Sequence, residues 1–327
     1  MKTLLPRSFL HACLTLAALS CAPLTALAQG YPTKPVKIIV PAGAGGAADL
    51  LARALGEHMG NAMGASFVTE NRGGAGGIIG SDAVAKAAPD GYTVLFAQNG
   101  LAISTAANPK LPFNGETDLI PVVAVAATPH ILVVPMTSPA KSVQDLIAMA
   151  KKSKAQLNFG SSGIGNSDHM AAELFKVMAG IDGGHLPYRG GALAATDTIS
   201  GQLDFYFAGM PVGLPQAQAG RLRALGVTGK SRFPAAPDVP TVAEQGLAGF
   251  EHVLWQGFFV PKGTPPDVIK KISDDVLKIL SAKSVTDNMA SKGIAAFPLA
   301  SAPFREYYVA DIAKWRKVVK SSGIVLQ

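Results

Sequence analysis

Residues 36–60, VKIIVPAGAGGAADLLARALGEHMG, combine a short apolar run, a glycine-rich turn and a helical pattern. The run Val36–Val40 is typical of a buried parallel strand. Beyond the turn, apolar residues at four-residue spacing predict an amphipathic helix that ends near Gly60: Leu51, Leu55 and Met59. A strand that enters a helix through glycines is the repeating piece of α/β proteins, so this stretch predicts an α/β fold.

A second glycine-rich turn, Gly160–Gly165, has the same setting as the first. It follows the short apolar run Leu157–Phe159 and leads into a helix start at Ser167-Asp168-His169. Free backbone N–H groups at a helix N-terminus bind anions, and glycines let a ligand approach the main chain closely. We therefore expect the two turns to face each other as an anion-binding clamp.

The rest of the chain alternates strand-like and helical patterns. Two apolar passages, Ile120–Pro135 and Phe250–Pro261, interrupt the alternation and are interpreted as crossovers between lobes. The 327 residues, 48% of them hydrophobic, suffice for two α/β lobes with their own cores, and we find no internal repeat. We predict two Rossmann-like lobes joined by two crossover strands, with lobe 1 at 29–127 and 253–327 and lobe 2 at 128–252.

Smaller signals place individual elements. Strand-like runs are predicted at Ser66–Val68, Thr93–Ala97 and Ile131–Val134. Ser142-Val143-Gln144-Asp145 is typical of a capping box, and Thr264-Pro265 is typical of a helix start. Core-facing stripes are expected in the two C-terminal helices: Ile272, Val276 and Ile279, then Phe304, Tyr308, Ile312, Trp315 and Val319.

The N-terminus has the pattern of a secretory signal. Lys2 and Arg7 precede an apolar run that ends in Ala26-Leu27-Ala28. This predicts a signal peptide at 1–28, cleavage near Ala28 and a periplasmic protein. The only two cysteines, Cys13 and Cys21, lie inside that segment, so neither disulfide nor thiolate chemistry is expected in the mature chain.

Composition excludes several function classes. The net charge is +7, of which Lys2 and Arg7 contribute two, and the basic residues are scattered, so neither nucleic acid nor a membrane surface is an expected partner. The six histidines never reach H-x-x-x-H spacing, and no metal site is predicted. Ile164 stands where the last glycine of the nucleophile elbow G-x-S-x-G belongs, which disfavours a serine hydrolase.

An exported NAD-dependent oxidoreductase of Rossmann type is the alternative from another class. Gly43, Gly45 and Ala48 fit G-x-G-x-x-G/A, and Glu70 follows where the ribose-binding acid would lie. Against this, Asp49 in the first helical turn would place a carboxylate near the pyrophosphate. We expect no cofactor and no catalysis.

Ordered motifs cover nearly all of the chain after residue 28. They are Val40-Pro41-x-x-x-Gly45-Gly46-x-x-Asp49-x-x-Ala52-Arg53, Glu70-Asn71-Arg72-x-Gly74-Ala75-Gly76-Gly77, Asp90-Gly91-Tyr92-Thr93, Ser161-Ser162-Gly163-x-Gly165, His185-x-Pro187-Tyr188-Arg189-Gly190-Gly191, Asp197, Gly201-Gln202 and Asp238-Val239-Pro240-Thr241. In this set the chain resembles the Bug-type extracytoplasmic solute receptors of tripartite tricarboxylate transporters.

The resemblance implies a type II periplasmic binding protein fold that closes like a Venus flytrap. It implies a monomer that binds a small carboxylate and delivers it to the permease subunits of the transporter; a sensor for a membrane kinase remains an alternative. The ligand-binding residues carried over are Ala42, Gly43, Gly45, Gly46, Ala47, Ala48 and Asp49 in the first loop, Ser161, Ser162, Gly163, Gly165 and His169 in the second, and Tyr188, Arg189, Phe207, Ala208 and Gly209 in the far lobe.

Several of these roles have a structural alternative. Asp49 either contacts the ligand or orients its own loop, and His169 is interpreted as a helix-start residue held by backbone. Gly74–Gly80 is interpreted as a tight loop after Glu70-Asn71. Arg189 is either a surface charge or a ligand contact, and Trp255 either packs in the core or lines the cleft.

The first loop departs from the family pattern in a way that bears on ligand size. The family usually has a bulky aromatic residue after Val-Pro and often a hydroxyl residue before the loop aspartate, whereas this chain has Ala42 and Ala48 there, with Gly43 where proline is common. A missing ring frees space. We therefore expect a ring-bearing or otherwise bulky carboxylate, unless Phe207 or Trp255 refills the gap.

Overall fold

The computed structural model describes residues 30–152 and 156–322. The predicted signal peptide and both cysteines lie outside the described residues. The strands are β1 Val36–Val40, β2 Phe67–Asn71, β3 Thr93–Gln98, β4 Leu119–Pro135, β5 Leu157–Ser161, β6 Gly183–Pro187, β7 Phe205–Gly209, β8 Leu222–Val227, β9 Val253–Pro261 and β10 Ala296–Ala300. The helices are α2 Ala47–Met63, the 3₁₀ turn η1 Ala75–Gly77, α3 Ile78–Ala85, α4 Gly100–Ala107, α5 Val143–Lys152, α6 Ser167–Ala179, α7 Gly191–Ile199, α8 Met210–Gln218, α9 Pro266–Ser281, α10 Lys283–Ser291 and α11 Ser301–Ser322.

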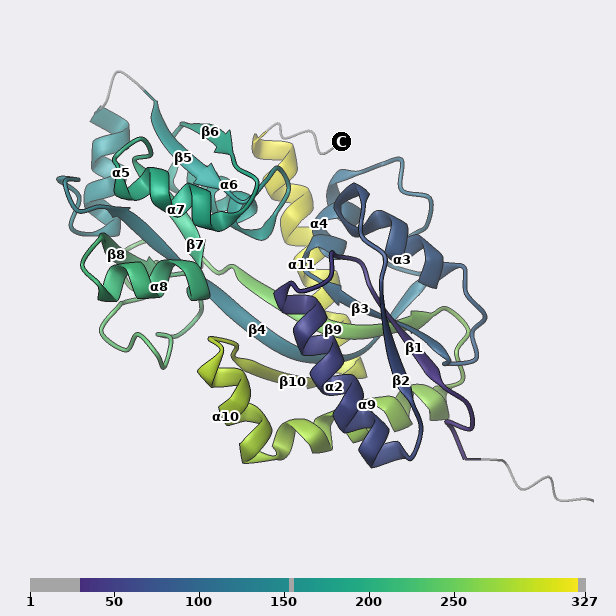
Figure 1. Cartoon of the computed structure of the whole chain (residues 1–327). Helices are drawn as coiled ribbons and strands as arrows, with labels where there is room; N and C mark the ends of the chain where they lie inside the picture. The colour runs from purple at the N-terminus through teal and green to yellow at the C-terminus, as the bar shows by residue number, and fades with distance from the viewer. Residues whose placement is uncertain (1–29, 153–155, 323–327) are drawn as a thin grey trace, which may run out of the picture.

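The long strand β4 joins two sheet regions (Figure 1). As far as Pro129 it pairs antiparallel with β9, and from His130 it pairs with β7 and β8. We call the part around β1, β2, β3, β9 and β10 lobe 1 and the part around β5 to β8 lobe 2. The first predicted crossover, Ile120–Pro135, is thus a continuous strand that passes through both lobes.

The second crossover is shorter than predicted. Strand β9 pairs with β3 and β4 in lobe 1 and begins at Val253. The chain enters it through His252, whose N–H donates to the carbonyl of Thr228 at the end of lobe 2 (2.9 Å). The two-lobe fold is confirmed, while the boundaries predicted at 128 and 252 remain a prediction.

Each lobe contains the same βα unit although the sequence has no repeat. In lobe 1 the order is β1–α2–β2–α3–β3–α4, and in lobe 2 it is β5–α6–β6–α7–β7–α8. In each unit the first strand lies between the other two and is parallel to both. Parallel strands place their carboxyl ends at one edge, so each lobe directs three helix N-termini to one side of its sheet.

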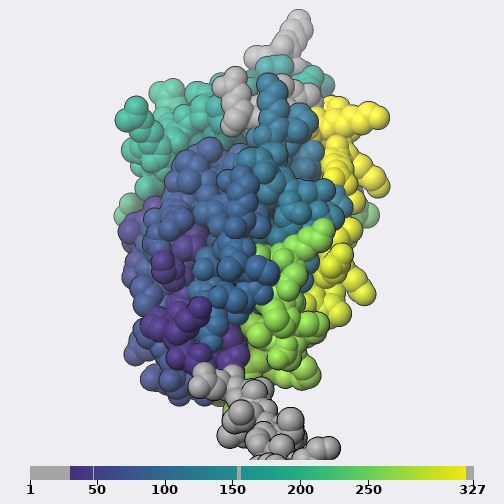
Figure 2. Space-filling view, turned by 90° about the vertical axis from the view of Figure 1, so that its right-hand side faces the viewer, coloured from purple at the N-terminus to yellow at the C-terminus, as the bar shows by residue number. Residues whose placement is uncertain are grey.

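The C-terminal helix α11 packs against both lobes. It contacts α4 of lobe 1, α6 of lobe 2 and the shared strand β4. Its predicted apolar stripe is buried except for Val319, which is half-buried. Trp255 of β9 packs edge-on against Phe304 and Tyr308, and its ring N–H donates to Asp311 (2.8 Å). Trp255 therefore belongs to the core. In Figure 2 the yellow residues of α11 border blue and green segments from distant parts of the chain.

Several predicted element bounds need correction. Helix α2 continues past Gly60 to Met63 and ends at Gly64, whose φ of 66° suits glycine and whose N–H donates to the Gly60 carbonyl. Strand β2 extends to Asn71 because it pairs along the whole of β1. The capping box at Ser142 is half formed: Ser142 accepts the Asp145 N–H (3.1 Å), but the Asp145 carboxylate accepts the N–H of Lys141.

Candidate ligand-binding cleft

A cavity of about 1250 Å³ is lined by residues of both lobes. Lobe 1 contributes three stretches, Pro41 to Gly43, Gly73 to Ile78 and Gln98 to Gly100, and three further residues, Gly46, Ser104 and Asn108. Lobe 2 contributes Ser162, Ile164 to Asp168, Gly191, Tyr206, Gly209 and Val212, and the crossovers contribute His130 and Leu254. Among the described residues the lining includes no lysine or arginine.

Six helix N-termini surround this cavity, three from each lobe. The lining holds the N-cap residues of five helices and the first residue of α7: Gly46 of α2, Gly77 of α3, Asn99 of α4, Asn166 of α6, Gly209 of α8 and Gly191 of α7. Four of these six helices have a glycine as N-cap, and neither Asn99 nor Asn166 caps its own helix with its side chain. The first N–H groups of a helix carry a partial positive charge, so the cavity wall attracts an anion without a cationic side chain.

The first loop is fixed by Asp49. This buried carboxylate accepts the N–H of Gly45 (2.8 Å) and pairs with Arg53 (2.9 Å). The Gly45 hydrogen bond, followed by that from Arg53, lowers the pKa of Asp49. Gly45 has a φ of 81°, a conformation that glycine adopts without strain. Asp49 therefore orients its own loop, and a contact with the ligand remains a prediction.

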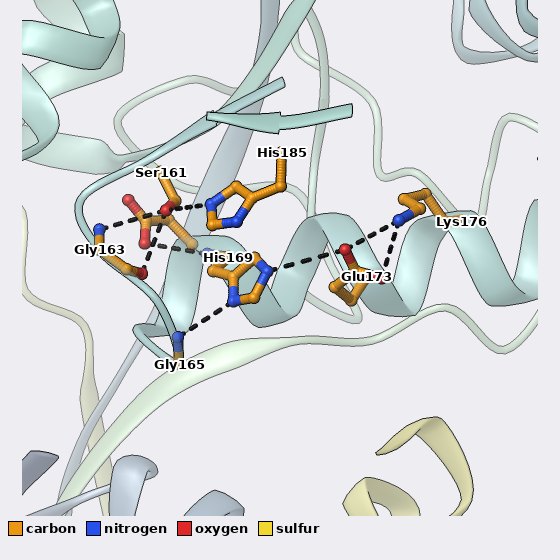
Figure 3. Close-up of polar contacts among 8 residues, drawn as sticks. Ser161, Gly163, Gly165, His169, Glu173, Lys176 and His185 are labelled. Carbon is orange, nitrogen blue, oxygen red and sulfur yellow. Dashed lines mark hydrogen bonds and ion pairs between the residues drawn. The ribbon is translucent and has the colours of Figure 1, made fainter. Parts of the chain in front are cut away.

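The second loop is held by two side chains of α6. Asp168 accepts the N–H and the hydroxyl of Ser162 (2.6 and 2.9 Å) and the hydroxyl of Tyr206 (3.1 Å). The N–H of Gly165 donates to Nδ1 of His169 (3.0 Å). Figure 3 shows this loop wrapping over the start of the helix. Both turns of the predicted clamp are thus fixed in place by residues in the first turn of the following helix.

A cluster of polar side chains lies behind the second loop (Figure 3). The rings of His169 and His185 stack at 3.8 Å, and the His185 Nε2 lies 2.6 Å from the Ser161 hydroxyl. Glu173 lies 3.7 Å from His169 Nε2 and accepts a hydrogen bond from Lys176 (2.8 Å). Burial lowers the pKa of His169 to about 3, with a further contribution from His185. A neutral His169 keeps Nδ1 free to accept the Gly165 N–H.

The predicted ligand-binding residues fall into three groups. Six line the cavity: Ala42, Gly43, Gly46, Ser162, Gly165 and Gly209. Six lie in the same two loops or in the first turns of their helices without lining it: Gly45, Ala48, Asp49, Ser161, Gly163 and His169. Four lie apart from the lining: Tyr188, Arg189, Phe207 and Ala208. Ala47 is the first residue of α2.

Ala48 of the second group is buried in the core of lobe 1. The residues of the third group have other contacts: Phe207 and Ala208 are buried in the cores, and Phe207 stacks on Phe250. The Tyr188 hydroxyl donates to Asp197 (2.7 Å), and Arg189 is exposed. In β7, Tyr206 and Gly209 line the cavity, whereas Phe207 and Ala208 between them do not.

Several lining residues were missed from the sequence. The segment Gly74–Gly80, predicted as a tight loop, packs Gly77 and Gly80 against Pro41, and its residues as far as Ile78, with Gly73, also form part of the wall. Gln98 to Gly100 follow β3 directly, so the rule that ligands bind at the carboxyl ends of parallel strands would have found them. No local signal identified His130, Tyr206 or Leu254, which come from three separate parts of the chain.

The chain is similar to a known protein family over most of its length. The family described as tripartite tricarboxylate transporter family receptor matches residues 51–324. A UPF0065 protein in the tcbD-tcbE intergenic region of Pseudomonas sp. strain P51 is 36% identical over 292 residues, covering 89% of this chain and 87% of that protein. Protein BugT of Bordetella pertussis is 34% identical over 304 residues, covering 92% of this chain and 93% of BugT.

A solved structure is similar to this chain in its three-dimensional fold. R. palustris Rpa4515 with adipate has a TM-score of 0.76 and 33% sequence identity, covering 90% of this chain and 99% of that chain.

No helix of the described residues has the length and apolar character that a membrane crossing requires. In residues 30–152 and 156–322, no three histidine, cysteine or acidic side chains gather as a metal site would need.

Proposed function

The chain belongs to the tripartite tricarboxylate transporter receptor family, and from this premise we propose that it captures a small carboxylated solute between its two lobes and delivers it to the permease subunits of a transporter of that type. Receptors of this family are periplasmic solute-binding proteins and not enzymes. The signal pattern that ends at Ala28 supports export of this chain to the periplasm.

One observation carries the proposal: six helix N-termini meet at a cavity whose described lining has no lysine or arginine. Backbone N–H groups form short, charge-assisted bonds to a carboxylate, and these bonds strengthen when the lobes exclude water. Because three ends come from each lobe, a bound anion stabilises the state in which both lobes contact it. This is the physical basis of ligand-driven closure.

The alternative of a dinucleotide enzyme has less support. In the fingerprint Gly43-x-Gly45-x-x-Ala48, the N–H of Gly45 already donates to Asp49 and is not available to a pyrophosphate. The Asp49 carboxylate would also repel that group. For a sensor that signals to a membrane kinase, no contact among the described residues offers specific support, so delivery to a permease remains the proposal.

The part of the cavity wall that the first loop forms favours a ligand larger than a short diacid. Ala42 and Gly43 line the cavity, and nothing lies within 4 Å of the position that a Cβ on Gly43 would occupy. Phe207 and Trp255, which were considered as replacements for the missing ring, are fully buried in the core. We therefore propose that the solute is a ring-bearing or otherwise bulky carboxylate.

Native mass spectrometry of the protein purified from its host tests the solute class. A carboxylic acid that co-purifies supports the receptor, whereas a nicotinamide dinucleotide supports the enzyme. Calorimetry then compares benzoate with benzamide, which has the same ring but no charge. Binding of benzamide as tight as that of benzoate would contradict recognition by helix N-termini, because their field acts on the charge.

A further inference from the structure

His130 is a buried polar residue of the cleft that lies outside the two glycine-rich loops. It lies where β4 passes between the lobes, and it lines the cavity with only 4% of its surface exposed. Its Nδ1 is fully shielded and has no hydrogen-bond partner among the described residues, so Nε2 is the ring nitrogen that can meet a molecule in the cavity. Buried polar groups in native proteins are nearly always paired, so an unpaired ring beside a cavity needs a reason.

The surrounding structure holds the His130 ring in place. Its backbone N–H donates to the Thr228 hydroxyl (2.7 Å), and its carbonyl accepts the Thr228 N–H (2.9 Å). The ring stacks on that of His252 at 5.2 Å. His252 is itself fixed, because its Nε2 lies 2.8 Å from the hydroxyl of Ser167. The ring is therefore positioned without a hydrogen bond of its own.

The groups that face His130 do not use its hydrogen-bonding capacity. His252 meets it face to face through the ring planes. Asp168 is the nearby acid, but its oxygens already accept from Ser162, Tyr206 and the backbone of His169. Burial lowers the pKa of His130 to about 4, so near neutral pH the ring is uncharged, with one N–H donor and one acceptor nitrogen.

We propose that His130 is a specificity-determining residue that donates its Nε2–H to an oxygen of the carboxylated solute bound in the cleft. This rests on the proposed function. Opposite His130 in the sheet lies Gly209, the N-cap of α8, so the ring and a helix N-terminus border the same part of the cavity. A solute oxygen placed there accepts from both, and a solute with only a hydrocarbon group at this position leaves the ring unpaired.

The test compares His130→Phe, which keeps a flat ring but removes both nitrogens, with His130→Asn, which keeps a donor. The exposed His58 on α2 supplies the matched control His58→Phe. Calorimetry with adipate, succinate and benzoate measures the dissociation constant for each. For the probe that wild type binds most tightly, we expect His130→Phe to weaken binding about tenfold, as the loss of one hydrogen bond does. His130→Asn should weaken it less, and the control should not change it.

Thermal unfolding without ligand separates recognition from a structural role. If the ring serves the ligand, replacing an unpaired polar ring by phenyl leaves the melting temperature of the ligand-free protein unchanged or raises it. A lower melting temperature, or unchanged affinity for all probes that bind, overturns the inference and leaves the proposed function intact. If wild type binds none of the three probes, the proposed function fails and the inference falls with it.

Discussion

Asp49 and His169 occupy equivalent positions in the two lobes: each is the third residue of its helix, and each accepts the N–H of the glycine four residues before it. The N–H of Gly45 bonds to Asp49 at 2.8 Å and that of Gly165 to His169 Nδ1 at 3.0 Å. The acceptor is a carboxylate in one lobe and a neutral imidazole in the other. The two loops thus have the same geometry but respond differently to pH.

Removing the acceptor should loosen each loop. Asp49→Ala and His169→Phe remove the hydrogen-bond partner of the loop glycine N–H, which we expect to lower the free energy of unfolding by about 1–2 kcal/mol each. Asp49→Asn is the matched control, since its amide carbonyl still accepts, and it should cost less than Asp49→Ala. Urea denaturation measures all three, and equal losses for the alanine and asparagine variants would contradict a hydrogen-bonding role.

Stability should decrease on acidification below about pH 6.5. The folded-state pKa of His130 is about 4 and that of His169 about 3, so between these values and about 6.5 the unfolded chain binds protons that the folded chain does not. Each such histidine contributes a loss of up to about 1.4 kcal/mol per pH unit as pH falls.

Denaturation curves at several pH values between 6.5 and 4.5 check this pH dependence. Over this pH range the unfolded chain binds more protons than the folded chain, and His130 accounts for up to one of them. Replacing His130 by phenylalanine removes this contribution, so the slope of unfolding free energy against pH should be shallower than in wild type. The exposed-site variant His58→Phe should keep the wild-type slope. A slope that is unchanged in His130→Phe would mean that this ring is already protonated in the folded protein.

The hydrogen bond between Asn99 and Ser167 should hold the two lobes together. The Asn99 amide of lobe 1 donates to the Ser167 hydroxyl of lobe 2 (3.0 Å), which in turn bonds to His252 (2.8 Å). Small-angle scattering of wild type should show a smaller radius of gyration with saturating adipate than without it. Ser167→Ala breaks the link between the lobes, so its ligand-free radius should exceed that of wild type. An identical envelope for wild type with and without bound adipate would argue against hinge closure.

Ala42→Phe should select against large ligands. Ala42 lines the cavity, and a phenyl ring there overpacks it when a bulky solute is bound, at a cost of about 1–3 kcal/mol for benzoate and little for succinate. Ala44→Phe, on an exposed residue of the same loop that does not line the cavity, is the matched control. Tight binding of succinate to wild type, without measurable binding of any ring-bearing acid, would overturn the size argument.

The sequence by itself determined the local parts of this protein. The glycine turns after Val36–Val40 and Leu157–Phe159 were correctly predicted to open helices, because strand, turn and helix signals lie within about ten residues of one another. The N–H groups at a helix start depend only on local backbone geometry. For that reason the two loops that hold Gly43, Gly46, Ser162 and Gly165 could be predicted without a structure. These four residues line the cavity, and their contact with a ligand stays a prediction.

Tertiary structure decided which of these parts face one another. In β7 the predicted segment Phe207–Gly209 has one cavity residue, Gly209, because the strand end reaches the cleft while the two residues before it pack into the cores. The equivalence of the two βα units leaves no trace as a sequence repeat. His130, Asn99 and Tyr206 meet at the cavity only because β4 runs through both lobes and the parallel strands end at a common edge, and such long-range pairing is not encoded in any one stretch of the chain.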